Sequence, residues 1–250
     1  MKKVIVIILA VVLVAMLGAT GVFAQENPNA SAKATAQIEG LTVISESEAV
    51  QPDDDAVDDW VYDLDTNPED WHVILTQTIK TANNKDLFID ASLLSGLYTK
   101  TVVRSKGGDK EASAAAGAVL LAVTVDYDET KPPSEWLAWP GPIIYNARAQ
   151  VLTATLQGIV ELVDEDGVYS LNITAPEEIG LFIATLSANS FNWIVDDLNS
   201  GMHTVEVWAK CVTYAGTSKG SAEAVAVIGL GSVTIEEVRM VKGEDAVPEF

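Results

Sequence analysis

A short proline-rich segment holds the residues that are most typical of ligand binding. Residues 131–142 read KPPSEWLAWPGP, so Trp136 and Trp139 lie in a stretch that four prolines stiffen. Aromatic rings on a pre-ordered loop can stack on sugar rings with little loss of conformational entropy. Tyr145 follows closely in the sequence and is a third candidate. The alternative is that the two tryptophans fold back and cover the open end of a β-sandwich.

An acidic stretch that precedes this segment carries oxygen-bearing side chains at alternate positions. Asp63, Asp65 and Asn67 are spaced as the first ligands of calcium-binding loops are. However, Pro68 stands where such a loop needs glycine, and the twelfth position is Ile74, whose side chain has no oxygen. We therefore expect an acidic, solvated segment and no cofactor, with weak calcium binding as the alternative.

Residues that commonly perform catalysis are scarce. His72 and His203 are the two histidines, Cys211 is the single cysteine, and no G-x-S-x-G motif occurs. The histidines lie far apart in sequence, without the clustering that zinc sites show. A pair of carboxylates can cleave glycosides, but 36 acidic residues make a chance pair uninformative. We expect no catalytic activity, and we expect Cys211 to be a small buried residue.

The charge balance excludes several partners. The chain has 15 basic and 36 acidic residues, which gives a formal net charge of −21. Such a surface repels the phosphates of nucleic acids, and no basic stripe offsets it. Basic partners and divalent cations remain compatible with this charge.

The N-terminal residues are typical of a secretory signal peptide, assigned to residues 1–24. Lys2 and Lys3 precede an apolar run over residues 4–17, and small residues lead to Ala24. The run is shorter than the roughly 20 apolar residues of a membrane span. We expect cleavage after Ala24, no stable transmembrane segment afterwards, and a secreted or cell-surface location (periplasmic if the host has an outer membrane). An uncleaved anchor is the alternative.

Composition divides the rest of the chain into three parts. Residues 25–59 are rich in Ala, Ser, Glu and Asp, which predicts an acidic low-complexity leader or linker. Within it, residues 38–44 form an apolar piece that is either the first strand of the domain or a strand lent to a neighbouring subunit. Residues 60–242 form the folded domain, and residues 243–250 a frayed tail. The residues expected to mediate self-association are Ile38, Leu41 and Val43.

Two-residue alternation dominates the domain and predicts strands. Val119, Leu121, Val123 and Val125 share one face of the clearest strand, and residues 205–213 alternate in the same way. Strand-like segments recur between turn signals, about ten in all, without alternating helices. The sequence therefore predicts an all-β fold, an antiparallel two-sheet sandwich of jelly-roll-like type.

One short helix is expected over about residues 175–188. Thr174 and Glu177 have the spacing of a capping box, with Pro176 in the first turn. The apolar residues that follow recur at helical spacing. They are Ile179, Phe182, Ile183 and Leu186.

Two segments near the C-terminus carry a resemblance. Residues 201–207 read GMHTVEV and residues 231–239 read GSVTIEEVR. They resemble the closing strands of jelly-roll domains on secreted and fibre-type proteins. The same ending is similar to that of a group of uncharacterised exported microbial proteins. The resemblance implies a fold and an extracellular location, and it brings no catalytic residues with it.

These observations favour a secreted or cell-surface structural protein without catalytic activity that self-associates by strand addition. The alternative is an extracellular carbohydrate- or ligand-binding module that uses Trp136, Trp139 and Tyr145.

Overall fold

A computed structural model describes residues 33–49, 71–105, 110–156, 159–165, 168–175 and 177–239. The expected signal peptide, the calcium candidates Asp63, Asp65 and Asn67, and the expected tail at residues 243–250 lie outside the described residues. Within the described ranges, no helix has the length and apolar character needed to cross a bilayer.

The described residues form ten strands and one short 3-10 turn at Pro133–Glu135. The strands are β1 (Lys33–Ala49), β2 (His72–Thr81), β3 (Lys85–Ser105), β4 (Lys110–Val125), β5 (Ile143–Thr155), β6 (Ile159–Glu165), β7 (Val168–Ala175), β8 (Glu177–Leu198), β9 (Gly201–Thr217) and β10 (Gly220–Val238).

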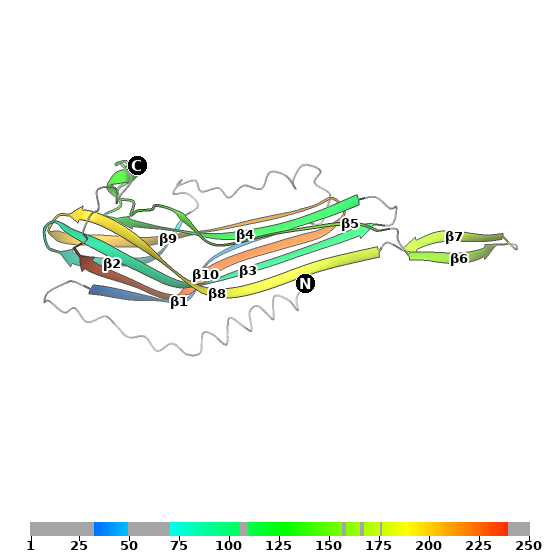
Figure 1. The fold of residues 1–250 in the computed structure, drawn as a ribbon, viewed down its shortest axis with the longest axis horizontal. Helices are drawn as coiled ribbons and strands as arrows, with labels where there is room; N and C mark the ends of the chain where they lie inside the picture. The colour runs from blue at the N-terminus through cyan, green and yellow to red at the C-terminus, as the bar shows by residue number, and fades with distance from the viewer. Residues whose placement is uncertain are drawn as a thin grey trace.

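Eight of these strands build two antiparallel four-stranded sheets that pack face to face (Figure 1). The first sheet has the order β1-β10-β3-β8 and the second the order β2-β9-β4-β5. The eight strands other than the β6–β7 hairpin pair in a nested order. The outermost pair in the chain is β1 with β10, followed by β2 with β9, β3 with β8 and β4 with β5. This nesting is the double Greek key of a jelly roll. The expected all-β sandwich is therefore confirmed.

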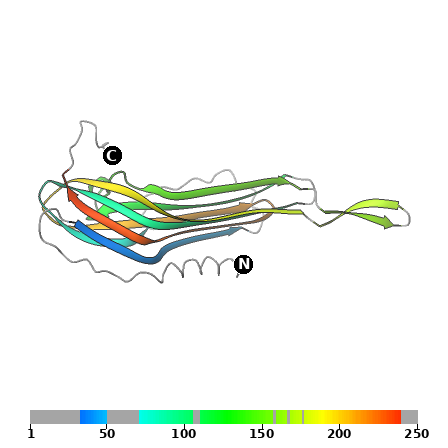
Figure 2. The same ribbon diagram turned by 60° about the horizontal axis from the view of Figure 1, so that its bottom comes forward.

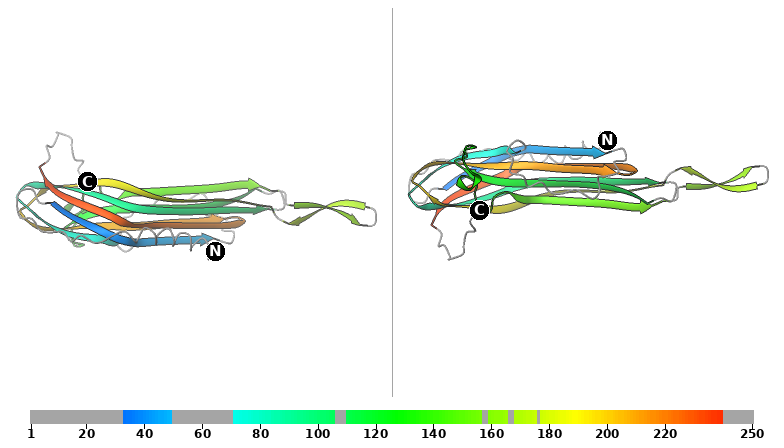
Figure 3. Two further views of the ribbon diagram at one scale, coloured as in Figure 1. Left: turned by 90° about the horizontal axis from the view of Figure 1, so that it is seen from below. Right: turned by 90° about the horizontal axis from the view of Figure 1, so that it is seen from above.

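The β6–β7 hairpin forms a separate two-stranded sheet between β5 and β8. It extends beyond one end of the sandwich along the long axis of the molecule (Figures 1 and 3).

The core lies between the sheets at the end of the sandwich away from the hairpin. Alternate residues of β3, among them Leu87 and Ile89, meet alternate residues of β4, among them Val119 and Leu121, and all four are fully buried. Burying one such side chain contributes about 1.5–3 kcal/mol, so this alternation provides much of the stability. The expected inward face of Val119, Leu121, Val123 and Val125 is confirmed.

Toward the hairpin, the interior next to β5 becomes polar. Asn146, Arg148 and Gln150 project from alternate positions of β5 across the gap between the sheets. Asn146 reaches Ser95 and Ser187, Arg148 reaches Thr185, and Gln150 reaches Thr99, Thr101 and the carbonyl of Leu181. These hydrogen bonds satisfy polar groups that would destabilise the fold if they were buried alone.

The expected helix over residues 175–188 is wrong, because Glu177–Leu198 is the long strand β8. The strand pairs with β3 along its length, from Lys85↔Leu198 to Ser105↔Glu177. Main-chain pairing with a neighbouring strand overrides the local capping signal, since helix propensity is a weak preference that tertiary context outweighs. The apolar residues that suggested one helical stripe are consequently distributed over both faces of a strand.

The first sheet bends where β1 and β10 are irregular (Figure 2). Register shifts occur between Ile38 and Val43 in β1 and between Gly229 and Gly231 in β10. Gly231 has a φ of +156°. A Cβ atom there would lie 2.1 Å from the carbonyl oxygen of Ser92 on β3. Only glycine allows the two strands to approach so closely at this bend.

We predict that Gly231→Ala lowers the free energy of unfolding by about 3 kcal/mol or more, because the strained φ and the backbone clash add. Chemical denaturation followed by circular dichroism measures this change. The matched control is Gly117→Ala on β4, where the added Cβ would meet its neighbours at 3.5 Å or more. An equally small effect of both substitutions would contradict the close approach.

Candidate functional site

The proline-rich loop closes one side of the sandwich. Its residues 136–138 pair antiparallel with the end of β4, with a hydrogen bond from the Val125 amide to the Trp136 carbonyl and another from the Ala138 amide to the Val123 carbonyl. Trp139 then exchanges two main-chain hydrogen bonds with Ile194 of β8, in the other sheet. Ala138 is buried in the core between these two attachments. The loop therefore joins the two sheets.

The loop directs its two tryptophans to different surroundings. Trp139 is half-buried at the outer edge of β8. Trp136 is also half-buried, and its indole N–H donates to the carbonyl of Lys131 at 3.1 Å. Trp136 lines a pocket on the outer face of the second sheet, and Trp139 does not. The sequence placed both in one candidate site because it could not show which ring faces which sheet.

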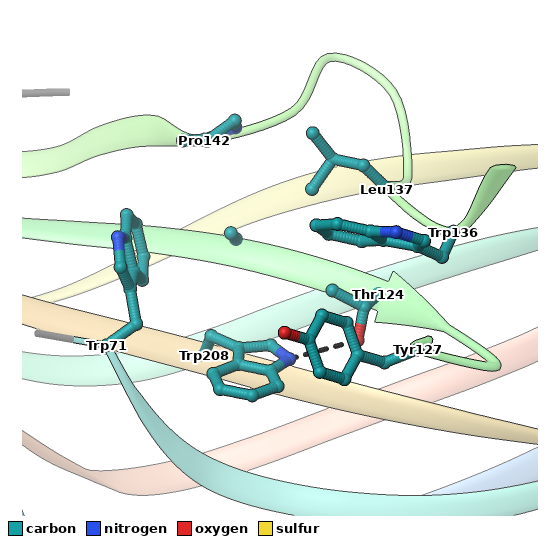
Figure 4. Close-up of a pocket in the computed structure, with 8 residues that line it drawn as sticks. Trp71, Thr124, Tyr127, Trp136, Leu137, Pro142 and Trp208 are labelled. Atoms are coloured by element: carbon teal, nitrogen blue, oxygen red, sulfur yellow. Dashed lines mark hydrogen bonds between the residues drawn. The ribbon is translucent and has the colours of Figure 1, made fainter. Parts of the chain in front are cut away.

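The pocket is an aromatic cluster, which we define as Trp71, Tyr127, Trp136 and Trp208 (Figure 4). The ring centroids of Tyr127 and Trp136 are 4.9 Å apart in an edge-to-face arrangement. Those of Tyr127 and Trp208 are 5.2 Å apart. The indole N–H of Trp208 donates to the Thr124 hydroxyl at 2.9 Å. Edge-to-face aromatic pairs are worth about 0.5–1.5 kcal/mol beyond their buried area, so the rings hold one another in place.

The cavity among these rings is small. Its volume is about 30 Å³, and its lining is apolar. That volume is close to the share of one water molecule in the liquid, whereas pockets for small molecules usually measure about 300–1,000 Å³. A sugar ring could stack on the outside of the cluster but could not enter it.

Tyr145 lies apart from the aromatic cluster. It packs against the core, and its hydroxyl sits between β3 and β8. The oxygen accepts from the Leu93 amide at 2.9 Å, and the hydroxyl hydrogen is shared between the carbonyls of Leu93 and Asn189. Burial raises the pKa of Tyr145 above its usual value. This side chain fastens β5 to the first sheet.

The self-association candidates lie in β1. Ile38 and Val43 are buried against the core of their own chain. Leu41 is placed by its backbone only, opposite Gly229 of β10. Residues 38–44 thus lie within a longer strand that pairs with β10 in the same molecule.

Cys211 and His203, two of the few residues of types that commonly perform catalysis, have partners within the fold. The Cys211 thiol lies 3.8 Å from the carbonyl of Val43, and burial raises its pKa to about 12, so it stays protonated at neutral pH. In the part of the chain that the structure describes, no three His, Cys, Asp or Glu side chains gather as a metal site would require.

The side chain of His203 connects β9 to Asp126 and Asn199, and we call these two contacts the His203 latch. Its Nδ1 lies 2.6 Å from a carboxylate oxygen of Asp126, and its Nε2 lies 2.9 Å from the carbonyl oxygen of Asn199. Both partners can only accept, so the doubly protonated imidazolium satisfies both contacts. Burial by itself would lower the pKa of His203, but the hydrogen bonds to Asp126 and Asn199 outweigh it, and the pKa is raised above 6.5.

The sequence analysis missed two groups of surface residues. The first is the rest of the aromatic cluster, because Trp71, Tyr127 and Trp208 come from three separate segments. The second is a set of exposed apolar side chains on β8, which the sequence analysis had assigned to a helix. No signal in the sequence indicates that these aromatic residues meet. The absence of charged residues from 179 to 194, however, can be seen in the sequence and could have indicated an apolar surface.

Comparisons with known proteins add no assignment. No family model matches the sequence, and a search of curated proteins found no match. The structure of infectious bursal disease virus Gx strain aligns with 88% of this chain and 44% of that chain, at 11% identity and a TM-score of 0.15. The chain therefore spans less than half of the matched viral chain, and a TM-score this low carries no argument.

We predict that the His203 latch makes stability depend on pH. Because the folded-state pKa is raised, its contribution is complete below about pH 6.5 and is lost as pH rises through the folded-state value. Denaturation at a series of pH values should show this decline in the wild type and its loss in His203→Gln. The exposed His72, changed to Gln, is the control and should retain the decline. A His203→Gln profile identical to wild type would contradict the latch.

Proposed function

We propose that this protein is an exported, non-catalytic structural or interaction protein that self-associates by exchanging β1 between copies. The observation that carries the proposal is that β1 is a strand at the sheet edge and is held to its sheet by β10 alone. The signal-like N-terminus supports a location outside the cytoplasm.

Exchange of β1 requires no new contact. The strand pairs with β10 from Lys33↔Glu236 to Ala49↔Ala222 and buries Ile38 and Val43. A copy of β1 from a neighbour would make the same contacts, so protein concentration decides between the two arrangements. Residues 50–71 separate β1 from β2. That segment can span about 70 Å when extended, which is enough to reach an adjacent molecule.

The chemistry of the described residues supports a non-catalytic role. Both ring nitrogens of His203 are engaged within the fold, and the Cys211 thiol is protonated at neutral pH. The cavity in the aromatic cluster measures about 30 Å³, well below the roughly 300–1,000 Å³ of pockets that enclose small molecules.

A cross-linking experiment tests the exchange. Thr35 and Thr234 lie directly opposite each other on the outer face of β1 and β10. Opposed residues of antiparallel strands have Cα atoms about 4.5–5.5 Å apart, within disulfide range. We predict that Thr35→Cys with Thr234→Cys, in a Cys211→Ser background, gives covalent oligomers on non-reducing gels after oxidation.

Thr35→Cys alone in the same background is the matched control and should give no ladder of oligomers. A double variant that forms only an intrachain disulfide would show that β1 stays in its own molecule, and the exchange would then be wrong.

A second candidate function is glycan binding at the aromatic cluster, favoured by the half-exposed ring of Trp136 on a loop held at both ends. We predict that a soluble oligosaccharide from a diverse panel changes the tryptophan fluorescence of the mature protein, and that Trp136→Ala abolishes the change. Trp139→Phe, outside the cluster, should retain it. Binding that survives Trp136→Ala, or a panel without any response, would end this candidate.

A further inference from the structure

One half of β8 exposes apolar side chains on both faces. The strand is the edge of the first sheet opposite to β1. Phe182 is 73% exposed, the highest value of the five large apolar residues there. The others are Ile179, Leu181, Ile183 and Leu186, each between 39% and 48% exposed. A long apolar edge strand of this kind is a template for pairing with another chain.

The same stretch is free of the charges that usually protect an edge. Residues 179–194 read IGLFIATLSANSFNWI, without one Asp, Glu, Lys or Arg in a chain whose net charge is −21. Lysine, glutamate and proline are the residues that block edge pairing in monomeric β proteins. The helical spacing of these apolar residues conflicts with their position in a strand, and such conflicts between local pattern and fold are expected at functional surfaces.

The main chain of β8 is oriented to accept a partner at Phe182. On the outer edge, Ile194 exchanges two hydrogen bonds with Trp139. The β3–β8 ladder has no irregularity from Val195 to Glu177, and antiparallel strands alternate the direction of these groups with period two. The amide and carbonyl of Phe182 therefore point to the same outer edge as those of Ile194.

We propose that this edge binds the β8 edge of a second copy of the chain, antiparallel and about a two-fold axis at Phe182. In this register the small residues Gly180 and Ala184 stand opposite each other and flank the two phenylalanine rings. On the other face, Leu181 stands opposite Ile183 of the second copy. The edge is thus complementary to itself, as a two-fold interface must be. The two first sheets become one sheet of eight strands.

Charge favours this pairing over the other edge of the same sheet. The nearest acidic side chain, Glu178, is paired with Arg104 at 2.5 Å in its own molecule. In the dimer, the two copies of Glu178 would lie eight residues apart along the strands, about 27 Å. Because the Debye length in physiological salt is about 8–10 Å, repulsion between these two carboxylates would be screened. By contrast, β1 presents exposed Glu46 and Glu48 along its length, which a contact with β8 would strip of water.

The β6–β7 hairpin indicates the same place for a partner. It forms a sheet of its own beyond the sandwich, and β8 follows it directly in the chain (Figures 1 and 2). A two-stranded ribbon is only marginally stable in water by itself. An antiparallel second copy on β8 would lie alongside the base of this hairpin.

The test is a cysteine at the two-fold axis, in the mature chain with Cys211→Ser. Phe182→Cys should give a disulfide-linked dimer on oxidation, since directly opposed Cα atoms in a hydrogen-bonded pair are about 5.5 Å apart. Leu186→Cys is the matched control, exposed on the same face of the same strand. Its two sulfur atoms would lie about 27 Å apart, so it should give at least tenfold less dimer.

Light scattering on Phe182→Asp completes the test. The change should raise the dissociation constant of the dimer at least tenfold, while Met202→Asp, at an apolar residue that is 61% exposed on β9, should leave it unchanged. A monomeric wild type, or equal cross-linking of the two cysteine variants, would overturn the proposal. The contact does not depend on exchange of β1. The β8 dimer should persist when the disulfide between residues 35 and 234 holds β1 in its own molecule. The experiments therefore test the β8 contact and the exchange of β1 independently.

Discussion

The insertion of β10 between β1 and β3 is the constraint on which the rest of the structure depends. The last strand of the fold pairs on one side with the first strand and on the other with β3, so the first sheet is complete only when the two ends of the domain meet. Gly231 allows this by bringing the backbone of β10 close to Ser92 at the bend. The same arrangement leaves β1 and β8 as the two edges of that sheet, and every proposal about association follows from it.

The two sides of the sandwich near β8 are closed by different means. Toward one end, the proline-rich loop pairs with both β4 and β8 and places Ala138 in the core. Toward the hairpin, polar side chains of β5 reach the main chain and side chains of β8 across the gap. These contacts hold β8 in place but leave its apolar side chains exposed. Among the described residues, the apolar edge of β8 is open and a polar groove of about 510 Å³ lies between β1 and β9, whereas the cavity in the aromatic cluster measures about 30 Å³.

The sequence predicted the fold class and much of the core. Inward and outward positions alternate along a half-buried strand, and apolar and polar residues alternate in the sequence for the same reason. Val119 to Val125 illustrate this, and so does Val205 with its alternating neighbours. The helix prediction failed because a capping box and an apolar spacing are local signals, whereas pairing with β3 over the whole of β8 is not. The candidate site was predicted in part. Trp136 lies at the aromatic cluster, but Tyr145 and Trp139 serve contacts between the sheets.

What the sequence determined by itself was the period of its strands, the sign and size of its charge, and the lack of any motif that concentrates chemistry in one place. What only the tertiary structure decided was which strands are edges, which rings meet, and which apolar residues stay exposed. The physical reason is that the exposure of a side chain depends on which residues lie next to it in space. Phe182 and Leu121 are equally apolar in the sequence, but Leu121 lies between two packed sheets while Phe182 lies where no further strand of the described chain covers it.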